Sequence, residues 1–588
     1  MKYISNILLL LFLLLVPVSC EKFLDATESN ANEIDGETVF SDFNSYREFV
    51  NYLYQGLTDY YSYEYNYLPG VASDELQWAC SDWKTMAPHS LIAGDYWSGE
   101  RNTETTWKYI GPKGNKYGRS PLNSAYEAIR TANMTIENID KLNDERKGEL
   151  LGQAYFFRAW FHFEIIRRVG GMPYIDHVLT TDEDMDFARE SYRQCTDKIV
   201  ADCRKAAELL PRKWAQATVD AGRVTRGAAV ALKGMALLFD ASPTMNYLET
   251  GAYEYDTERL KEALVPLSDI IENYGDIYEL VNATTPEEYG SIFYSRNRMF
   301  SPEVIFGVPP TSQSDSFVEG LYRQSNLYNS MFSPQPYDAK YKKRNSVPTD
   351  NLVRKFETAS GLSIADDTEY NEAKPYEGRE PRFYYSILYD GVQWGYKNGK
   401  HLSFNTIGNI DKTDRWTGYY IRKYWPEDAN DLNGIGNYKY QQNWIHIRLA
   451  GVYLNYAEAA NEVYGPDVVP DGCKYSALQI VNMLRSKRAH VDVNPLYTAN
   501  KDTFREKIRD ERAVELCFEH NRWWDIRRWH IAHTPEVRKI YRMNKVKNVY
   551  VREEMKTLER VYEEKHYWYP LDRDDVDMMS NLKQNPGW

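Results

Sequence analysis

A succession of amphipathic helical segments constrains the fold more than any other feature of the sequence. Between residues 121 and 274, apolar residues recur at three- and four-residue spacing, which places them on one face of a helix. Stops such as Gly170-Gly171 and Ser242-Pro243 separate the segments. Successive helices joined by short turns favour stacked pairs of the tetratricopeptide kind, since each pair leaves an apolar face for its neighbour to cover. The spacing predicts helices near 121–141, 145–169, 189–210, 226–241 and 257–274.

The pattern changes between about 280 and 445, where Pro, Gly, Asn and aromatic residues become frequent and helical runs become rare. Val392, Trp394 and Tyr396 alternate with polar or small residues before Asn398-Gly399. That arrangement is a strong signal for a hairpin with a two-residue turn. We therefore predict a large loop and hairpin insertion, and loops on a rigid scaffold are where binding residues usually lie.

Helical periodicity returns after the insertion, near 446–464, 475–489 and 502–519. The chain is thus expected to be mostly α, with a tetratricopeptide-like helical-repeat scaffold interrupted by a large loop and β-hairpin insertion. We expect its two regions, 20–275 and 276–588, to form one integrated globular unit.

The N-terminus has the pattern of an export signal. Ile7–Val16 is an unbroken apolar run of ten residues, shorter than the about 20 needed to span a bilayer. Ser19 before Cys20 resembles a lipobox, although Pro17 stands where leucine is usual. We therefore predict a signal peptide over residues 1–19 and a lipid anchor on Cys20. The alternative is a soluble secreted protein with an ordinary cleavage site.

Charge and cysteine usage argue against two classes of function. The chain has 71 basic and 85 acidic residues, a net charge of −14, and no segregated basic patch, so nucleic acid is not an expected partner. After Cys20, an odd number of widely spaced cysteines remains, and no C-x-x-C or His/Cys cluster indicates zinc. We expect no disulfide framework, no metal and no cofactor, and interpret the thiols as packing residues. They are Cys80, Cys195, Cys203, Cys473 and Cys517.

The sequence offers one catalytic candidate, because the common nucleophile, metalloprotease and nucleotide-binding motifs are missing. Glu511, Glu515 and Glu519 are spaced four apart on one predicted helical face, and a retaining glycosidase needs two carboxyls about 5–5.5 Å apart. However, a general acid needs a raised pKa, whereas neighbouring arginines lower it. We predict a structural ion-pair network, with a catalytic Glu515–Glu519 pair as the alternative. The arginines expected in the network are Arg509, Arg512, Arg522, Arg527 and Arg528.

Aromatic residues make up 14% of the chain, with 48 Tyr and 15 Trp. Part of them must be core, and the rest are available as stacking platforms. A glycan site combines aromatic rings, which stack on the C–H faces of sugars, with carboxylates and amides that bind hydroxyls. Any single loop aromatic could instead be packing, but their clustering with acidic residues favours a site. The predicted ligand-binding residues are Asp74, Trp78, Trp83, Trp97, Tyr322 and Trp394.

Short motifs in a fixed order run along nearly the whole chain. They are Cys20-Glu-Lys-Phe-Leu-Asp25, Gln153-Ala-Tyr-Phe-Phe-Arg-Ala-Trp160 leading to Gly170-Gly171, Gly222-Arg-Val-Thr-Arg-Gly227, Glu380-Pro-Arg-Phe383, Asn455-Tyr-Ala-Glu-Ala459, Glu511-Arg-Ala-Val-Glu-Leu516 and the ending Gln584-Asn-Pro-Gly-Trp588. In this order they resemble the SusD/RagB family of surface nutrient-binding lipoproteins. Glu380 stands where Asp is common in the family, and Trp588 where Tyr is frequent.

The resemblance implies four tetratricopeptide-like helix pairs, with the ligand site on variable loops across from them. It also implies a lipid-anchored position in the outer membrane, facing outside, and a partner, a TonB-dependent transporter of the SusC type. We therefore predict a non-catalytic receptor that captures an oligosaccharide and delivers it to that transporter. The alternatives are a helical glycoside hydrolase and a receptor of the same architecture for a peptide or another nutrient. Because the family's contacts come from variable loops, the predicted site residues rest on aromatic chemistry alone.

Overall fold

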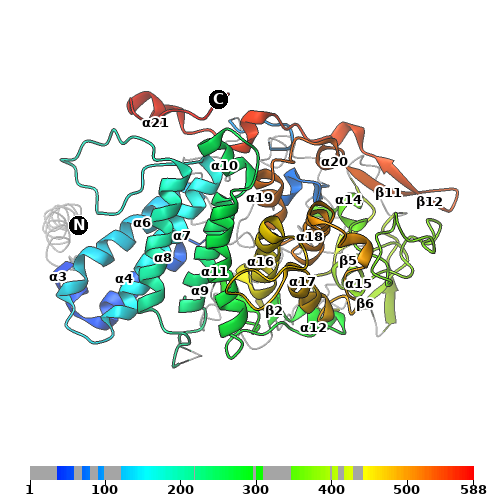
Figure 1. Ribbon diagram of the computed structural model, residues 1–588, viewed down its shortest axis with the longest axis horizontal. Coiled ribbons are helices and arrows are strands. Elements are labelled where there is room, and N and C mark those ends of the chain that lie inside the picture. The colour runs from blue at the N-terminus through cyan, green and yellow to red at the C-terminus, as the bar shows by residue number, and fades with distance from the viewer. Residues whose placement is uncertain are drawn as a thin grey trace, which may run out of the picture.

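The computed structural model of the chain is a row of helices flanked by short strand ribbons (Figure 1). The structure describes residues 36–57, 69–79, 91–97, 121–216, 219–295, 300–308, 346–397, 400–407, 416–427 and 441–588. Within these ranges, no helix combines the length and the apolar character that crossing a membrane requires.

Helices that follow one another in the sequence pack side by side in the first half of the chain (Figure 1). α6 packs on α7, α7 on α8, α8 on α9, and α9 on α11. All five predicted helices of this region are present, with small shifts at their ends. The bounds are α3 Gly36–Ser41, α4 Phe43–Gln55, α6 Pro121–Asn138, α7 Lys147–Val169, α8 Tyr192–Leu209, α9 Arg226–Asp240, α10 Pro243–Thr250 and α11 Thr257–Asn273.

The helical row continues across the insertion. α16 (Leu449–Tyr464) packs directly against α11, although residues 274–448 lie between them in the sequence. α16 in turn contacts α17 (Ala477–Ser486) and α18 (Lys501–Glu515). The prediction of a mostly α fold is confirmed, and the insertion loops out of the row without breaking it. The remaining helices are short: α12 Pro286–Gly290, α14 Asp350–Val353, α15 Pro381–Ser386, α19 Asn521–Arg528, α20 Pro535–Arg538 and α21 Arg573–Met578.

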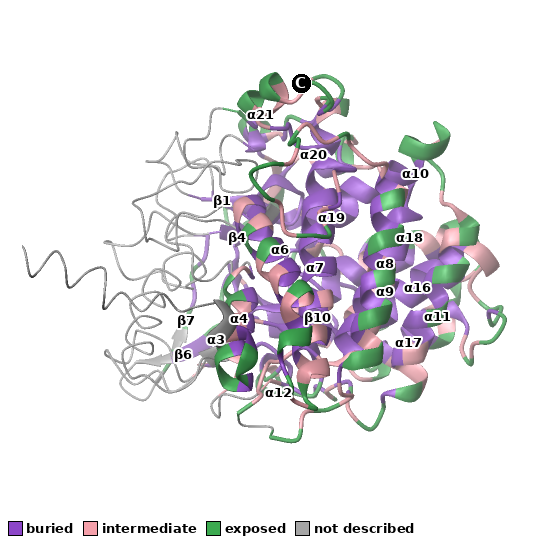
Figure 2. Cartoon of the chain, turned by 90° about the vertical axis from the view of Figure 1, so that its left-hand side faces the viewer, coloured by how far each residue is buried: buried purple, intermediate pink, exposed green. Residues whose placement is uncertain are grey.

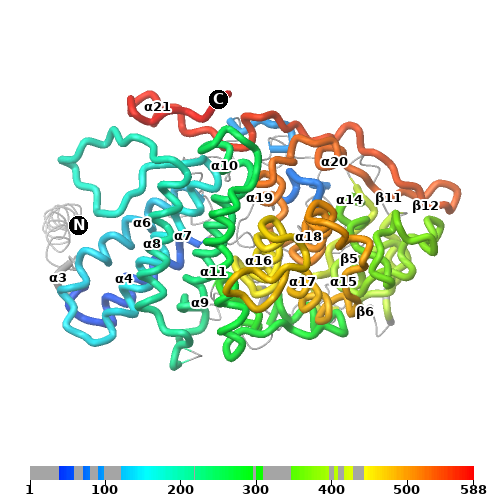
Figure 3. The backbone as a smooth tube through the Cα atoms, viewed as in Figure 1, coloured from blue at the N-terminus to red at the C-terminus, as the bar shows by residue number. Residues whose placement is uncertain are grey.

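The strands of the described residues form six separate two-stranded antiparallel ribbons. The predicted hairpin is present as β6 (Gln393–Lys397) and β7 (Lys400–Ser403). In Figure 3, the yellow-green segment after residue 346 lies at the end of the molecule away from α3 and α4. The other ribbons are β1 Leu76–Trp78 with β4 Ser346–Pro348, β2 Tyr294–Ser295 with β9 Gln441–Gln442, β3 Val304–Gly307 with β10 Ile445–Arg448, β5 Ile387–Leu388 with β8 Tyr420–Ile421, and β11 Tyr541–Val546 with β12 Val549–Glu554.

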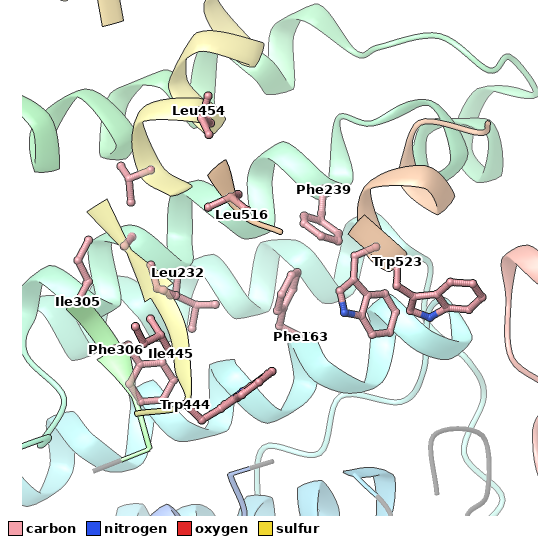
Figure 4. Packing of buried hydrophobic residues seen from close by; sticks show 14 of the residues in the cluster. Phe163, Leu232, Phe239, Ile305, Phe306, Trp444, Ile445, Leu454, Leu516 and Trp523 are labelled. Atoms are coloured by element: carbon pink, nitrogen blue, oxygen red, sulfur yellow. The ribbon is translucent and has the colours of Figure 1, made fainter. Parts of the chain in front are cut away.

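One contiguous hydrophobic core joins the helices to the ribbons. Phe306 of β3 lies edge-on to Trp160 of α7, with ring centroids 4.9 Å apart, and Phe163 contacts Phe239 of α9 in the same way at 5.2 Å. Figure 4 shows Phe306, Phe163 and Phe239 in the same cluster as Trp444, which precedes β10. Figure 2 shows the buried residues concentrated on the inner faces of the helices. Because aromatic side chains bury the largest areas, this seam contributes strongly to stability.

The cysteines of the described residues are packing residues, as predicted from their spacing. Cys195, Cys203, Cys473 and Cys517 are free thiols, and all but Cys473 are buried. Burial raises the pKa of the Cys195 thiol to about 11, so it stays protonated at neutral pH. Across the same part of the chain, no group of three or more His, Cys, Asp or Glu side chains is arranged to hold a metal ion.

The Gly170-Gly171 turn after α7 gives a stability prediction. A Cβ on Gly171 would lie 2.1 Å from the Glu190 carbonyl oxygen and 2.7 Å from the backbone of Ser191, so the backbone has to move. We expect Gly171→Ala to lower the free energy of unfolding by about 1–3 kcal/mol, the range for overpacking. The measurement is urea denaturation followed by tryptophan fluorescence.

A matched control lies on α7 itself. A Cβ on Gly148 would meet only the Leu209 side chain at 3.7 Å, an ordinary contact. Gly148→Ala should therefore be neutral, or stabilise by up to about 1 kcal/mol through helix propensity. Equal stability of the two variants would contradict the close approach at Gly171.

Candidate ligand-binding site

The β1–β4 ribbon joins the ends of two sequence segments that contain predicted site residues, 80–90 with Trp83 and 309–345 with Tyr322. Trp78, the last residue of β1, pairs with Ser346, the first residue of β4. Segment 80–90 therefore leaves the ribbon at the point where segment 309–345 enters it. β8 contacts β4, so the chain that follows segment 408–415 also reaches this ribbon. The predicted site residues Trp83 and Tyr322, like the predicted lipid anchor Cys20, lie outside the described residues.

The buried side chain of Arg560 holds the ribbon rigidly. Its guanidinium donates to the Ser73 carbonyl at 3.2 Å, to the Leu76 carbonyl at 2.8 Å and to Gln77 Oε1 at 2.9 Å. Thr349 adds a backbone bond to the Glu75 carbonyl at 3.0 Å. These hydrogen bonds fix the ribbon at the point where the two segments meet it.

Asp74, two residues before β1, is buried and does not face solvent. Its carboxylate is buried and accepts two bonds from the Arg522 guanidinium, each 2.8 Å long. Burial alone would raise the pKa of Asp74, but Arg522 outweighs it and holds the pKa below its usual value. The expectation that Asp74 binds sugar hydroxyls is not met, because both of its oxygens are engaged by this ion pair.

Trp78 and Trp394 are also enclosed. Both faces of the β1–β4 ribbon are covered, so Trp78 is buried. Trp394 is 0% exposed and lies edge-on to Phe404 in its own hairpin, with ring centroids 5.7 Å apart. Trp416 is nearly as enclosed and donates to the Thr406 carbonyl at 2.8 Å. For Trp78 and Trp394 the expectation of an open stacking face is therefore not met, because the β1–β4 ribbon is covered on both sides and Trp394 lies on the buried side of its hairpin, while Gln393 and His401 are exposed.

Trp97 is the predicted site residue that the structure places at the surface, with 37% of its area exposed. The C-terminal Trp588 lies edge-on to it at 5.8 Å, and the Arg573 guanidinium lies 4.2 Å from its ring centroid. Trp588 is itself fixed by bonds from its Nε1 to the carbonyls of Lys565 and Trp568, 3.0 and 2.9 Å long. The family-like ending thus positions an exposed indole, a role that the motif alone did not reveal.

The Glu511, Glu515 and Glu519 constellation is a buried ion-pair network. Arg382 donates to Glu511 at 2.6 Å and to Glu515 at 3.1 Å. Arg448 donates to Glu515 at 3.0 Å and to Glu519 at 2.7 Å. Further contacts come from Arg485 to Glu511 at 2.8 Å, Arg488 to Glu515 at 3.1 Å and Lys423 to Glu519 at 2.6 Å.

Two details of the predicted network are wrong. First, α18 ends at Glu515, because Phe518 and His520 adopt left-handed backbone conformations with φ of 66° and 70°. Glu519 therefore does not continue the helical face. Second, the arginines of the network come from remote segments, and Lys507 is the cation that α18 itself contributes, 3.5 Å from Glu511. The neighbouring arginines pair elsewhere: Arg509 with Glu506, Arg512 with Asp525, Arg522 with Asp74, Arg528 with Glu458, and Arg527 with the Tyr567 carbonyl.

The electrostatics of this network do not suit a general acid. Burial alone would raise the pKa of Glu515, but Arg488, Arg448 and Arg382 hold it well below its usual value. The same balance, with Arg448 and Lys423, lowers the pKa of Glu519. A glycosidase acid must instead carry a proton near neutral pH. Both carboxylates are ionised and enclosed, so their arrangement is structural.

These ion pairs should make the free energy of unfolding fall at acidic pH. Burial would raise the pKa of Glu458, but Arg528 lowers it from 4.5 to about 2, and the pKa of Glu511 is lowered in the same way by Arg382. Such groups stabilise the fold fully above the unfolded pKa and lose that contribution as pH falls through the folded one. We expect the urea midpoint to fall between about pH 4.5 and pH 2. An unchanged midpoint across this window would contradict the network.

Comparisons with known proteins extend over nearly the whole chain. A family model described as SusD family matches residues 302–588, and one described as starch-binding associating with outer membrane matches residues 22–235. A SusD-like protein of Formosa agariphila is 22% identical over 551 residues, 90% of each chain. A crystal structure of a SusD-like protein from Bacteroides fragilis is 27% identical with a TM-score of 0.74, covering 95% of this chain and 99% of that one.

A second structure from Bacteroides fragilis, described as a SusD-like carbohydrate binding protein, has a TM-score of 0.65 at 21% identity. It covers 93% of this chain and is itself covered completely, at 100%. At that identity, the likeness establishes the shared fold alone. It agrees with the helical row and looped-out insertion described above.

Proposed function

The chain belongs to the SusD/RagB family, and on that premise we propose that it captures a carbohydrate on the loops rooted at the β1–β4 ribbon. The observation that carries the proposal is the pairing of Trp78 with Ser346, which joins the roots of segments 80–90 and 309–345. These two segments contain the predicted contacts Trp83 and Tyr322. Because both segments meet the same ribbon, we propose that they contribute to one site.

The proposed chemistry is binding without turnover. Indole and phenol rings stack on the C–H faces of pyranose rings, and loop carboxylates and amides bind the hydroxyls. The buried carboxylates of Glu515 and Glu519 supply no proton at neutral pH, since their pKa values are lowered. The relatives described by a ligand are carbohydrate-binding or starch-binding proteins, which supports a glycan as the ligand class.

We also propose that the protein is anchored through acyl chains on Cys20 and passes its ligand to a SusC-type transporter in the outer membrane. The lipobox-like Ser19-Cys20 and the outer-membrane description of the matched family model support this position. Cys20→Ala expressed in a native-type host should leave the protein soluble after cell fractionation and should abolish labelling by a radioactive fatty acid. Retention of Cys20→Ala in the membrane fraction, or fatty-acid labelling of this variant, would contradict the anchor.

The binding proposal is tested by isothermal titration against neutral and charged oligosaccharides and peptides. We expect Trp83→Ala and Tyr322→Ala, in the two segments that meet the ribbon, each to weaken glycan binding by about three- to tenfold, the value of one ring contact. We expect the same of Trp97→Ala, at the exposed indole beside Trp588. The control is Tyr52→Ala on α4, whose side chain is 61% exposed and lies in the helical row. Unchanged glycan affinity in all three variants would contradict the site. Binding of peptides but of no oligosaccharide would show that the ligand is a peptide and not a carbohydrate.

A further inference from the structure

A groove is lined by residues of α10 and of the C-terminal segment. Figure 1 shows these elements side by side at the upper edge of the molecule. The volume of the groove is about 560 Å³, within the range of small-molecule sites. The turn after α7, the start of α8 and α10 form its sides with the C-terminal segment. In Figure 2, α10 lies on the opposite side of the molecule from β1 and β4. Its aromatic and charged lining includes Tyr247, Tyr253, Glu249, Glu564, Lys565 and Trp568.

Two exposed tyrosines form one wall of this groove. Tyr247 and Tyr253 are 41% and 38% exposed, and their rings stack with centroids 4.1 Å apart and planes 5° apart. The stack continues inward, since the His530 ring lies 3.5 Å from Tyr253 and stacks on Tyr567 at 4.3 Å. The result is a four-ring ladder with Tyr247 at its outer end. A cluster of exposed aromatic rings on a protein surface often indicates a binding site.

The ladder is fixed before any ligand arrives. The Tyr253 hydroxyl donates to Glu564 Oε1, and the His530 Nε2 lies 3.1 Å from the same oxygen. Asn246 Nδ2 of α10 donates to the Glu254 carbonyl at 2.9 Å, which ties the loop carrying Tyr253 to the helix carrying Tyr247. A preorganised platform avoids the entropic cost of ordering the rings upon binding.

The charges around the groove favour a neutral, hydroxyl-rich ligand. Glu249 and Glu564 offer carboxylate acceptors, and acceptors suit the hydroxyl donors of a sugar. Arg189 does not supply an anion site, because its guanidinium donates to the carbonyls of Gly171, Val169 and Lys583. Lys565 of the lining pairs with Glu563 at 3.3 Å. An anionic ligand would therefore meet two carboxylates, a lysine that is already paired and no free guanidinium from Arg189.

We propose that this groove is an additional carbohydrate-binding site that takes one or two neutral sugar rings against the outer face of Tyr247. It is separate from the loops rooted at β1–β4, and its ligand class rests on the proposed function. A second site on another side of the protein would let one chain hold a long polymer at two points, which raises the apparent affinity through effective concentration.

The test is isothermal titration of the full chain with neutral hexasaccharides of β-glucan, xylan, mannan and starch. We expect Tyr247→Ala to raise the dissociation constant of the groove site by about three- to tenfold. Tyr247→Phe keeps the ring and should bind as the wild type does. Tyr52→Ala, at a more exposed tyrosine on α4, should have no effect, and circular dichroism should show all three variants folded.

The outcomes separate the two proposals. The groove is supported if a binding event of the wild-type chain is weakened in Tyr247→Ala but is still present in Trp83→Ala. Glycan binding that Trp83→Ala weakens and Tyr247→Ala leaves unchanged overturns the groove and retains the loop site. If none of the hexasaccharides binds the wild-type chain, both proposals are overturned for neutral glycans.

Discussion

Replacing Glu515 by alanine is expected to lower the free energy of unfolding by about 3–5 kcal/mol, the range for breaking a buried ion pair by removing one partner. Glu515 is fully buried, and its carboxylate accepts from Arg382, Arg448 and Arg488. The variant leaves these three guanidinium groups with too little negative charge in a low-dielectric interior. Urea denaturation of purified protein measures the loss, and failure to accumulate folded protein is its extreme form.

The matched control is Glu506→Ala on the same helix. Glu506 pairs with Arg509 at 2.7 Å, but its side chain is 67% exposed, so water screens the pair. We expect a change of no more than about 1 kcal/mol, as for other surface pairs. If Glu515→Ala is as stable as Glu506→Ala, the structural role is contradicted. If this variant also loses a glycan-hydrolysing activity of the wild type, the catalytic alternative is supported.

Trp394→Ala should destabilise the protein by about 3–5 kcal/mol, the cost of deleting a large buried aromatic side chain. Its ring is fully enclosed and packs edge-on against Phe404 within the β6–β7 hairpin. Trp394→Phe should recover part of the stability by refilling much of the cavity. The measurement is the urea midpoint of each variant.

Trp97→Ala is the comparison that separates core from site. Its indole is partly exposed, so truncation should cost about 1 kcal/mol or less in stability while weakening glycan binding. The expected pattern is therefore crossed: Trp394 acts on stability, and Trp97 acts on binding. If Trp394→Ala keeps the stability of the wild type but no longer binds glycan, Trp394 contacts the ligand and the assignment to the core is wrong.

Local patterns in the sequence predict the helical row and the hairpin well. The helix over Lys147–Val169 follows from an apolar stripe and ends at the predicted Gly170-Gly171 stop. The β6–β7 hairpin follows from alternation around Asn398-Gly399. In each case, the forces that decide the element act between residues close together in the chain. The family resemblance then supplies how these elements are stacked.

Remote contacts decide what the sequence could not. Alternation around Trp394 predicts a strand with one buried and one exposed face, but the pattern does not say whether the aromatic face packs on the core or meets a ligand. The glutamates of α18 clearly require cations, yet Arg382, Arg448 and Arg485 approach from distant segments that no spacing rule connects. The Tyr247–Tyr253 stack was missed for the same reason, since it depends on how the loop after α10 folds back.

Incubating the wild-type chain with an oligosaccharide that it binds, and then analysing the recovered sugar, tests the central claim most directly. A receptor with its carboxylates held ionised in a buried network should show saturable heat of binding and return the sugar intact, with no new reducing ends after a day. New reducing ends that increase with protein concentration, or the absence of binding by every glycan tried, would contradict it.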